Sequence, residues 1–230
     1  MLARLICSRE IAPEVRHFEF EIPELHTLAF EPGQFLSFSD IVEGKTVTRA
    51  YSIASAPRGN RFDLCLNRVR EGRLSPRLFA LQPGETIACR GPFGSFTMRQ
   101  PGGDILMVAS GTGVAPFRSM IQAYLNRDSE RRWVLLMGVR FEESILYRTE
   151  FEEMAKTHPR FRFLPTLTRP DPEWRGLTGR VQAHLATLLS DLREPHVYVC
   201  GMKAMVNDVR ALLLSLGLDR SRILTEKYDN

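Results

Sequence analysis

The stretch "DILMVASGTGVAPFRSM", residues 104–120, decides the fold class of the second half of the chain. An apolar run is followed by two closely spaced glycines, Gly111 and Gly113, and then by the amphipathic run that begins "APFRSM". A short apolar run that ends at a glycine turn is typical of a buried strand, and the run after it has helical spacing. Glycine also allows tight turning and close approach of a ligand to the backbone. The start of a helix beyond such a turn is a ready site for phosphate.

The same strand-then-helix pattern recurs three times after this stretch. The pairs are "RWVLLMGV" (132–139) with "LYRTEFEEMAKTH" (146–158), "RFRFLPTLT" (160–168) with "GRVQAHLATLLS" (179–190), and "HVYVCG" (196–201) with "AMVNDVRALLLSLG" (204–217). Repeated units of this kind predict a parallel sheet covered by helices on both faces. Ligands of such sheets bind at the carboxyl ends of the strands. We therefore expect Cys200 and Gly201 to face the same crevice as Gly111 and Gly113.

The first half of the chain has a different pattern. Short runs alternate apolar and polar residues between Pro-Gly turn signals: "VRHFEFEI" (15–22), "GQFLSFSDI" (33–41), "RAYSIAS" (49–55), "RFDLCLNRV" (61–69) and "ETIACRG" (85–91). Such runs predict a small β-barrel or sandwich. One run, "SPRLFAL" (75–81), predicts a helix with Ser75 as N-cap and Pro76 at the first helical position. The change of pattern near Gln100 predicts two domains, residues 1–100 and 101–230.

Composition limits the function classes. The formal net charge is +4 and the sequence pI is about 9.0, and the excess is mostly arginine, which suits phosphorylated ligands or acidic partners. The four cysteines lack the spacing of a zinc or iron–sulfur site, and a disulfide framework is not expected. The apolar run at the N-terminus is too short for a signal peptide, and no apolar run reaches about 18 residues. We expect a reduced, cytoplasmic protein, monomeric, without a metal, a membrane span or a nucleic-acid partner.

Six short motifs occur in an order that resembles the ferredoxin–NADP(+) reductase family. They are "RAYS" (49–52), "GRLSPRLFAL" (72–81), "GPFGSF" (91–96), "GTGVAPFRSM" (111–120), "YVCG" (198–201) and "EKY" (226–228). The closest resemblance is to the bacterial ferredoxin/flavodoxin reductases, and it spans essentially the whole chain. It implies a two-domain fold: an N-terminal antiparallel β-barrel that binds FAD, and a C-terminal α/β domain with a parallel sheet that binds NADP(H). The C-terminal tail would return to the flavin.

The resemblance assigns the FAD contacts residue by residue. Arg49 would pair with the pyrophosphate, Tyr51 would pack on the isoalloxazine ring, and Ser52 would lie near flavin N5. These residue types suit the roles, because an arginine fork matches a diphosphate and an aromatic face matches a flat ring. The segment "GRLS" would wrap the pyrophosphate with backbone N–H groups and the Ser75 hydroxyl. The full FAD set is Arg49, Ala50, Tyr51, Ser52, Asn67, Val69, Gly72, Leu74, Ser75, Thr112 and Tyr228.

The resemblance also assigns the nicotinamide nucleotide and the catalytic residues. The NADP set is Gly111, Gly113, Arg140, Arg169, Arg180, Cys200 and Gly201, and the catalytic set is Ser52, Cys200 and Glu226. Cys200 would sit beside nicotinamide C4. Glu226 would orient the nicotinamide or exchange protons with reduced flavin, and both roles stay open. Tyr228 would stack on the other flavin face, although Asp229 and Asn230 follow it where many members of the family end.

Three arginines favour NADPH over NADH. The 2′-phosphate of NADP calls for arginine, and Arg140, Arg169 and Arg180 match the positions of arginines in the bacterial members that use NADP. Glu142 and Glu143 follow Arg140 closely, and their carboxylates could oppose a phosphate.

The expected reaction is hydride transfer between NADP(H) and FAD, with single electrons passing between FAD and a separate acidic carrier, ferredoxin or flavodoxin. Arginines near the flavin segments could steer such a carrier: Arg58, Arg61, Arg68, Arg70, Arg73 and Arg77. One alternative is an NAD(P)H-dependent reductase component of an oxygenase, or a free-flavin reductase, on the same fold. A second is a non-enzymatic electron-transfer or regulatory subunit.

Overall fold

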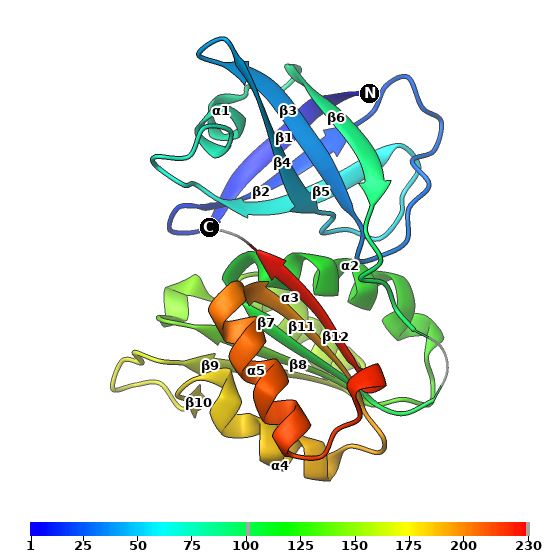
Figure 1. The fold of residues 1–230 in the computed structure, drawn as a ribbon, viewed down its shortest axis with the longest axis vertical. Helices are drawn as coiled ribbons and strands as arrows, with labels where there is room; N and C mark the ends of the chain where they lie inside the picture. Colours follow the sequence, from blue (N-terminus) through cyan, green and yellow to red (C-terminus); the bar gives the residue numbers. More distant parts are fainter. Residues whose placement is uncertain (100–101, 229–230) are drawn as a thin grey trace. The chain divides into compact units, whose positions relative to one another are not determined.

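The computed structural model describes residues 1–99 and 102–228. Contacts divide the chain into two compact units, each with its own sheet (Figure 1). The first unit is Met1–Met98 with Ala115–Tyr124, and the second is Arg99–Val114 with Leu125–Asn230. One helix, α2 (Ala115–Tyr124), therefore groups with the N-terminal strands, although it follows the first strand of the C-terminal half.

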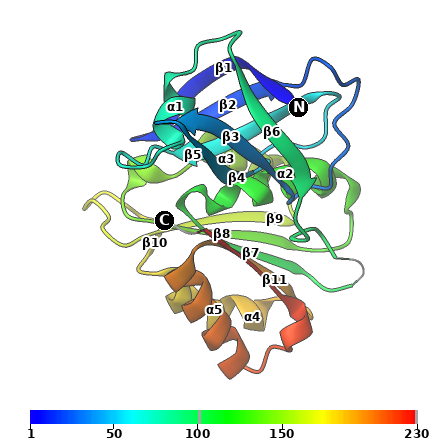
Figure 2. The same cartoon turned by 45° about the horizontal axis from the view of Figure 1, so that its top comes forward.

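The first unit is a closed antiparallel barrel. Its strands are β1 (Leu2–Ala12), β2 (Val15–Glu21), β3 (Phe35–Val42), β4 (Lys45–Ser52), β5 (Arg61–Asn67) and β6 (Thr86–Phe93). Figure 2 labels these strands, which hydrogen-bond in the order β4-β3-β6-β1-β2-β5. A bridge between Ile53 and Leu64 joins the two ends of that order. Phe18, Phe20 and Phe38 are fully buried inside it. The predicted antiparallel barrel is confirmed.

Strand β1 was absent from the sequence expectation, and its pairing shows why. It pairs with β2 and β6, and its register to β2 shifts between Leu5 and Cys7 and again between Glu10 and Ala12. Each shift breaks the alternation of inward and outward side chains, which is the pattern that marks a half-buried strand.

The second unit is a six-stranded parallel sheet. Its strands are β7 (Ile105–Ser110), β8 (Trp133–Val139), β9 (Phe161–Leu167), β10 (Leu177–Thr178), β11 (His196–Met202) and β12 (Ile223–Tyr228), in the order β10-β9-β8-β7-β11-β12. Its helices are α3 (Arg148–Thr157), α4 (Leu185–Asp191) and α5 (Lys203–Ser215). The predicted parallel α/β unit is confirmed, and the terminal "EKY" motif lies on β12, which pairs with β11.

Helices lie on both faces of this sheet. The core that contains Leu106, Val134 and Val197 is formed with side chains of α4 and α5. On α3, Phe151 packs against Phe161 and Phe163 of β9. The residues paired with Phe161 and Phe163 alternate with Val134 along β8, so α3 covers the opposite face. In the part of the chain that the structure describes, no helix is long and apolar enough to cross a membrane.

Candidate functional site

Strand β4 presents Arg49 and Tyr51 on one face, because they are two residues apart. Tyr51 is half-buried, and its ring meets the ring of Phe38 edge-on with centroids 5.9 Å apart. Burial raises the pKa of the Tyr51 phenol to about 12, so the ring stays neutral at physiological pH. The exposed Arg49 donates from Nη1 to the carbonyl oxygen of Thr48 at 2.8 Å and forms no ion pair within residues 1–99 and 102–228. Ala50 points to the other face.

The chain leaves β4 at a buried point. Ser52 is 6% exposed, and the residues after it, Ile53, Ala54 and Ser55, are also buried. The N–H of Ile53 donates to the carbonyl oxygen of Gln34 at 2.9 Å. Ser52 is therefore held at the end of a well-packed strand.

The loop between β5 and α1 (Ser75–Ala80) is closed by a serine. The backbone N–H of Val69 donates to Ser75 Oγ at 2.9 Å, and the N–H of Gly72 donates to the Val69 carbonyl at 2.9 Å. Asn67, the last residue of β5, and Val69 in the loop are exposed, and Leu74 is buried in the barrel core.

The expectation that Ser75 caps α1 is wrong. The N-cap is Leu74, which has helical backbone angles, and Leu78 N–H donates to its carbonyl at 3.0 Å. The helix begins one residue earlier than expected because the Ser75 hydroxyl bonds back to Val69 and not forward to the first turn. Ser75 thus stabilises the loop.

The sheet of the second unit changes direction between β7 and β11. Strands β8 to β10 extend from β7 on one side, and β11 and β12 extend on the other. Such a switch point is where open α/β sheets bind ligands, beyond the carboxyl ends of the strands. The loop at the end of β7 holds Gly111, Thr112 and Gly113, and the end of β11 holds Cys200 and Gly201. The expected convergence of these two loops is observed.

The two glycines of "GTG" have different surroundings. A Cβ on Gly113 would lie 2.3 Å from the Cys200 carbonyl oxygen, so glycine lets the two loops touch. A Cβ on Gly111, which has a φ of +50°, would meet no atom within 4 Å. Open space next to Gly111 is what a backbone cradle for a ligand needs, and Gly113 serves the packing of the loops.

Cys200 and Glu226 are direct neighbours on β11 and β12. Cys200 is fully buried, and its Sγ lies 4.0 Å from Glu226 Oε1. Burial, followed by the charge of Glu226, raises the pKa of the Cys200 thiol well above its ordinary value. The sulfur is therefore a neutral thiol at physiological pH, which suits packing against a ligand and not nucleophilic attack. Tyr228, the last described residue, is half-buried and pairs with Met202; Asp229 and Asn230 lie outside the described residues.

Arg140, Arg169 and Arg180 follow three neighbouring parallel strands, β8, β9 and β10. The N–H of Arg169 donates to the Arg140 carbonyl at 2.9 Å, which places those two residues side by side. All three are exposed, and none forms an ion pair with any described residue.

The acidic residues near Arg140 are partly neutralised. The Glu142 carboxylate forms an ion pair with Arg148. Arg148 Nε also donates to Glu152 Oε1 at 2.7 Å, and its guanidinium lies over the ring of Trp174, 5.8 Å from the centroid. Glu143 is exposed. Because Arg148 pairs with Glu142, that carboxylate opposes a phosphate near Arg140 less than its sequence position suggests.

Sequence reasoning missed Ser110, which joins the ends of β7 and β11. Its Oγ accepts the N–H of Met202 at 3.3 Å, and a Cβ on Gly201 would lie 2.2 Å from that oxygen. Its position directly before Gly111, at the carboxyl end of a strand, was the available signal.

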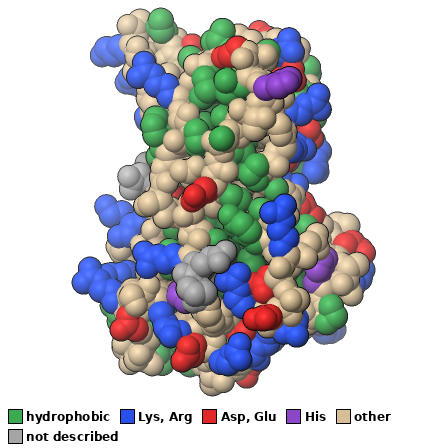
Figure 3. Space-filling model, turned by 90° about the vertical axis from the view of Figure 1, so that its right-hand side faces the viewer, with side chains coloured by type: hydrophobic (Ala, Val, Ile, Leu, Met, Phe, Trp, Pro, Cys, Tyr) green, Lys and Arg blue, Asp and Glu red, His purple; other side chains and the backbone are tan. Residues whose placement is uncertain are grey.

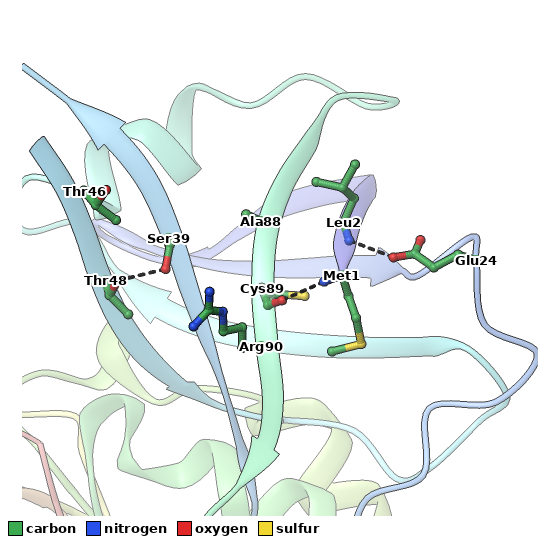
Figure 4. A pocket seen from close by; sticks show the side chains of 9 residues that line it. All are labelled: Met1, Leu2, Glu24, Ser39, Thr46, Thr48, Ala88, Cys89 and Arg90. Atoms are coloured by element: carbon green, nitrogen blue, oxygen red, sulfur yellow. Dashed lines mark hydrogen bonds between the residues drawn. The ribbon is translucent and has the colours of Figure 1, made fainter. Parts of the chain in front are cut away.

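A groove of about 570 Å³ lies on the barrel (Figure 4). Its wall includes Thr46 and Thr48, which alternate with Arg49 and Tyr51 along β4 and so face the opposite side. Ser39 Oγ and Thr48 Oγ1 bond each other at 2.8 Å. The Leu2 N–H donates to Glu24 Oε1 at 2.9 Å, and the amino terminus donates to the Cys89 carbonyl at 3.1 Å, so most of these polar groups bond one another. No group of three or more metal-ligating side chains occurs among the residues described.

Comparison with known proteins identifies two domains. Residues 2–98 match the oxidoreductase FAD-binding domain, and residues 107–211 match the oxidoreductase NAD-binding domain. Ferredoxin--NADP reductase B of Sorangium cellulosum is 43% identical over 237 residues, which is 99% of this chain and 97% of that protein. The glycine betaine monooxygenase reductase subunit of Chromohalobacter salexigens is 29% identical, over 94% of this chain and 60% of that protein.

A solved structure has the same fold over nearly its full length. The ferredoxin NADP+ reductase of Neisseria gonorrhoeae with bound FAD and NADP aligns with a TM-score of 0.84 at 23% identity. The alignment covers 99% of this chain and 98% of that one.

Proposed function

Because the chain belongs to the ferredoxin–NADP(+) reductase family, an FAD-dependent oxidoreductase family with FAD-binding and NAD-binding domains, we propose a division of labour between its halves. Residues 1–100 hold FAD, and residues 101–230 hold NADP(H). Electrons from NADPH pass through the flavin to a separate protein carrier. The observation that carries the proposal is the pairing of a buried neutral thiol, Cys200, with Glu226 beside the open Gly111 loop.

The barrel residues fit a flavin dinucleotide. The half-buried Tyr51 ring offers an apolar surface, and the Arg49 guanidinium on the same face of β4 is available for a diphosphate. The bonds from Val69 N–H to Ser75 Oγ and from Gly72 N–H to the Val69 carbonyl hold the loop in a fixed shape, and its other backbone N–H groups are the ones that would wrap a phosphate. Ser52, at the strand end, supplies a hydroxyl for the reactive edge of the flavin.

The α/β residues fit the nicotinamide end. Gly111 admits the nucleotide to the switch point, and Cys200 and Glu226 orient its ring. FAD and NADP(H), when bound, supply the electron-transfer chemistry, and the chain supplies orientation. Glu226 Oε1 lies 4.0 Å from the thiol, and Cys200 keeps its proton at Sγ because burial raises the pKa of the thiol. The assigned convergence of Ser52 with Cys200 and Tyr228 joins residues of different units and stays a prediction.

The arginines after β8, β9 and β10 support NADPH as the donor. Arg140 and Arg169 lie side by side and have no carboxylate partner in the described ranges, so their charges are available to a 2′-phosphate. Arg180 joins them from the turn after β10.

The carrier is an acidic protein such as ferredoxin. The name of the relative that is 43% identical supports the choice of ferredoxin. Four of the six barrel arginines are paired internally: Arg58 with Asp63, Arg61 with Glu21, Arg70 with Glu14 and Arg77 with Asp40. Arg68 and Arg73 form no ion pair with the described residues. On the face in Figure 3, basic side chains lie interspersed with acidic ones. Because Arg68 and Arg73 are exposed and have no carboxylate partner among the described residues, they are the strongest candidates for docking an acidic carrier.

Three finer points belong to the same proposal. Flavodoxin is a second carrier of suitable charge. The chain acts as a monomer, which light scattering on a sizing column would test. It works in a reducing compartment such as the cytoplasm, a proposal consistent with the cysteines, none of which forms a disulfide: Cys7, Cys65, Cys89 and Cys200.

The deciding experiment is the anaerobic absorbance of the purified chain with NADPH and NADH added separately. We expect a yellow protein whose flavin bands bleach with NADPH at far lower concentration than with NADH. A colourless protein that takes up no added FAD would overturn the proposal. Preference for NADH would favour the second candidate, an oxygenase reductase component, which is the kind of protein that the 29% identical relative is named for.

A further inference from the structure

Three side chains of α2 hold three consecutive residues that follow β4. The bonds run from Arg118 Nη1 to the Ala54 carbonyl at 2.8 Å, from Ser119 Oγ to the Ser55 carbonyl at 2.6 Å, and from the Ala56 N–H to Gln122 Oε1 at 3.0 Å. Residues 118 and 122 lie one turn apart on the same side of the helix. One helix face therefore fixes the path of residues 54–56, which we call the clamped segment.

The bonds from Arg118 continue into the barrel through Asp63. Arg118 Nη1 also donates to Asp63 Oδ2 at 3.0 Å, and Arg58 pairs with the other carboxylate oxygen. The backbone of Asp63 holds the clamped segment a second time. Its carbonyl accepts the Ala54 N–H at 2.8 Å, and its N–H donates to Ser55 Oγ at 3.0 Å.

These groups are buried. Arg118 is 8% exposed, Asp63 3%, Ser119 0% and Ser55 2%. Burying an ion pair takes two charges out of water, and apolar residues of similar size often stabilise a fold as well or better. A buried arginine at this place is therefore poorly explained by stability alone. Its fixed set of donors explains it better, because one nitrogen bonds both the clamped segment and β5.

The clamped segment begins two residues after Ser52 and three after Tyr51. A displacement of Ala54 must therefore alter the backbone that presents both side chains. The same helix follows directly on η1 (Gly111–Val114), whose Gly113 touches the Cys200 carbonyl.

We propose that Arg118 is a positioning residue for Tyr51 and Ser52: it fixes the clamped segment to Asp63 so that β4 presents both residues to the flavin in one geometry, with Ser119 and Gln122 completing the clamp. The inference rests on the proposed function, because it requires that Tyr51 and Ser52 face FAD.

The first test uses the chain without FAD. We expect hydrogen exchange to show that the Ala56 amide is at least tenfold less protected in Gln122→Met than in the parent chain. In Arg118→Met, the Ala54 amide should lose protection by at least the same factor. The control is Arg131→Met, which removes a partly buried arginine from Asp128 in the second unit. It should leave both amides as in the parent. Unchanged exchange in both α2 variants would overturn the clamp.

The second test uses the FAD-loaded chain. Arg118→Met should change the shape of the bound flavin's visible bands and circular dichroism. It should also lower kcat per bound flavin about tenfold or more, since a misplacement of about 1 Å can cost 100-fold, with KM for NADPH within twofold. Arg118→Lys restores a charge next to Asp63 and should recover FAD content more than kcat. Ser119→Ala is the milder variant if Arg118→Met does not fold.

A purely structural Arg118 predicts a different result. The variants would then unfold more easily and hold less FAD, while the fraction that holds FAD would keep the parent spectrum and kcat. That outcome overturns the inference and leaves the proposed function intact. A parent chain that binds no FAD would instead overturn the proposed function.

Discussion

The backbone N–H of Arg169 donates to the carbonyl oxygen of Arg140 at 2.9 Å, so the residues that follow strands β8 and β9 lie side by side. Both side chains are exposed and neither forms an ion pair in the described ranges. Adjacent cations without a counter-ion form a site for an anion, and a planar guanidinium fork suits phosphate. The pairing of β8 with β9 thus turns two arginines 29 positions apart into one candidate phosphate site.

Removing one of these arginines should weaken NADPH binding selectively. A hydrogen bond to a charged group contributes about 1.5–3 kcal/mol, so Arg140→Ala or Arg180→Ala should raise KM for NADPH roughly 10- to 100-fold. KM for NADH should stay nearly unchanged. Steady-state kinetics with both nucleotides measure this, and Arg162→Ala, at the other end of β9, is the control. Equal effects on the two nucleotides would sink the phosphate assignment.

The pairing of Glu142 with Arg148 gives a second prediction. Arg148→Met removes the arginine that pairs with the Glu142 carboxylate. Glu142 is two residues from Arg140, and a carboxylate that has lost its cation opposes a phosphate bound there. We expect KM for NADPH to rise several-fold while KM for NADH does not. Adding Glu142→Gln to Arg148→Met should restore most of the NADPH affinity. If Arg140→Ala acts as expected but Arg148→Met does nothing, the pairing has no role in selectivity.

The sequence predicted those parts of the candidate site whose pattern lies within a single segment of the chain. The strand–glycine–helix pattern around Gly111 and the strand ending at Cys200 were readable, because each feature lies within one segment. The approach of Gly113 to the Cys200 carbonyl follows from strand order, which no local pattern contains. The same holds for Arg118, which reads as an ordinary helical arginine until α2 is seen to pack on residues 54–56.

One wrong expectation and one missed strand both depend on contacts that the sequence hides. Ser75 precedes a proline and looks like a helix cap, but its hydroxyl bonds to Val69 on the far side of a loop. Strand β1 lacks clean alternation because of its register shifts. Sequence periodicity finds regular elements, and it fails where a bulge or a loop contact changes the geometry.

The two glycines of the "GTG" loop should differ sharply in tolerance. Gly113→Ala places a Cβ 2.3 Å from a backbone oxygen, which cannot move aside cheaply, so we expect several kcal/mol of destabilisation or failure to fold. Gly111→Ala meets open space and bears only the left-handed backbone, at about 1–2 kcal/mol. Urea unfolding of both variants measures the difference. Equal losses would mean that the β7 and β11 loops are not in contact.

Charge reversal at Arg68 and Arg73 should slow reduction of an acidic carrier. Electrostatic steering changes association rates by roughly 10- to 1,000-fold, and it weakens as salt shortens the Debye length. We expect Arg68→Glu with Arg73→Glu to lower kcat/KM for ferredoxin about tenfold at low ionic strength and to flatten its salt dependence. The control, Lys156→Glu on α3, makes the same type of charge change on the second unit. Carrier reduction that is insensitive to ionic strength in the parent would exclude a docking role for these arginines.

Stability should fall as the pH rises above 9, because buried thiols keep their protons in the folded state. Burial raises the pKa of Cys89 from 9.0 to about 11, and that residue is 2% exposed. Below pH 9 both states hold the proton and the stabilising contribution is complete. Between pH 9 and 11 the unfolded chain loses the proton first, so up to about 3 kcal/mol of stability is lost. The raised pKa values of Cys200 and Tyr51 act in the same direction.

Urea unfolding with reductant at pH 8 to 11 measures this loss. The free energy of unfolding should decline less steeply with pH for Cys89→Ala than for the parent. Val47→Ala, a buried change without a titrating group, should keep the parent slope, and a Cys89→Ala slope equal to the parent's would contradict the assignment.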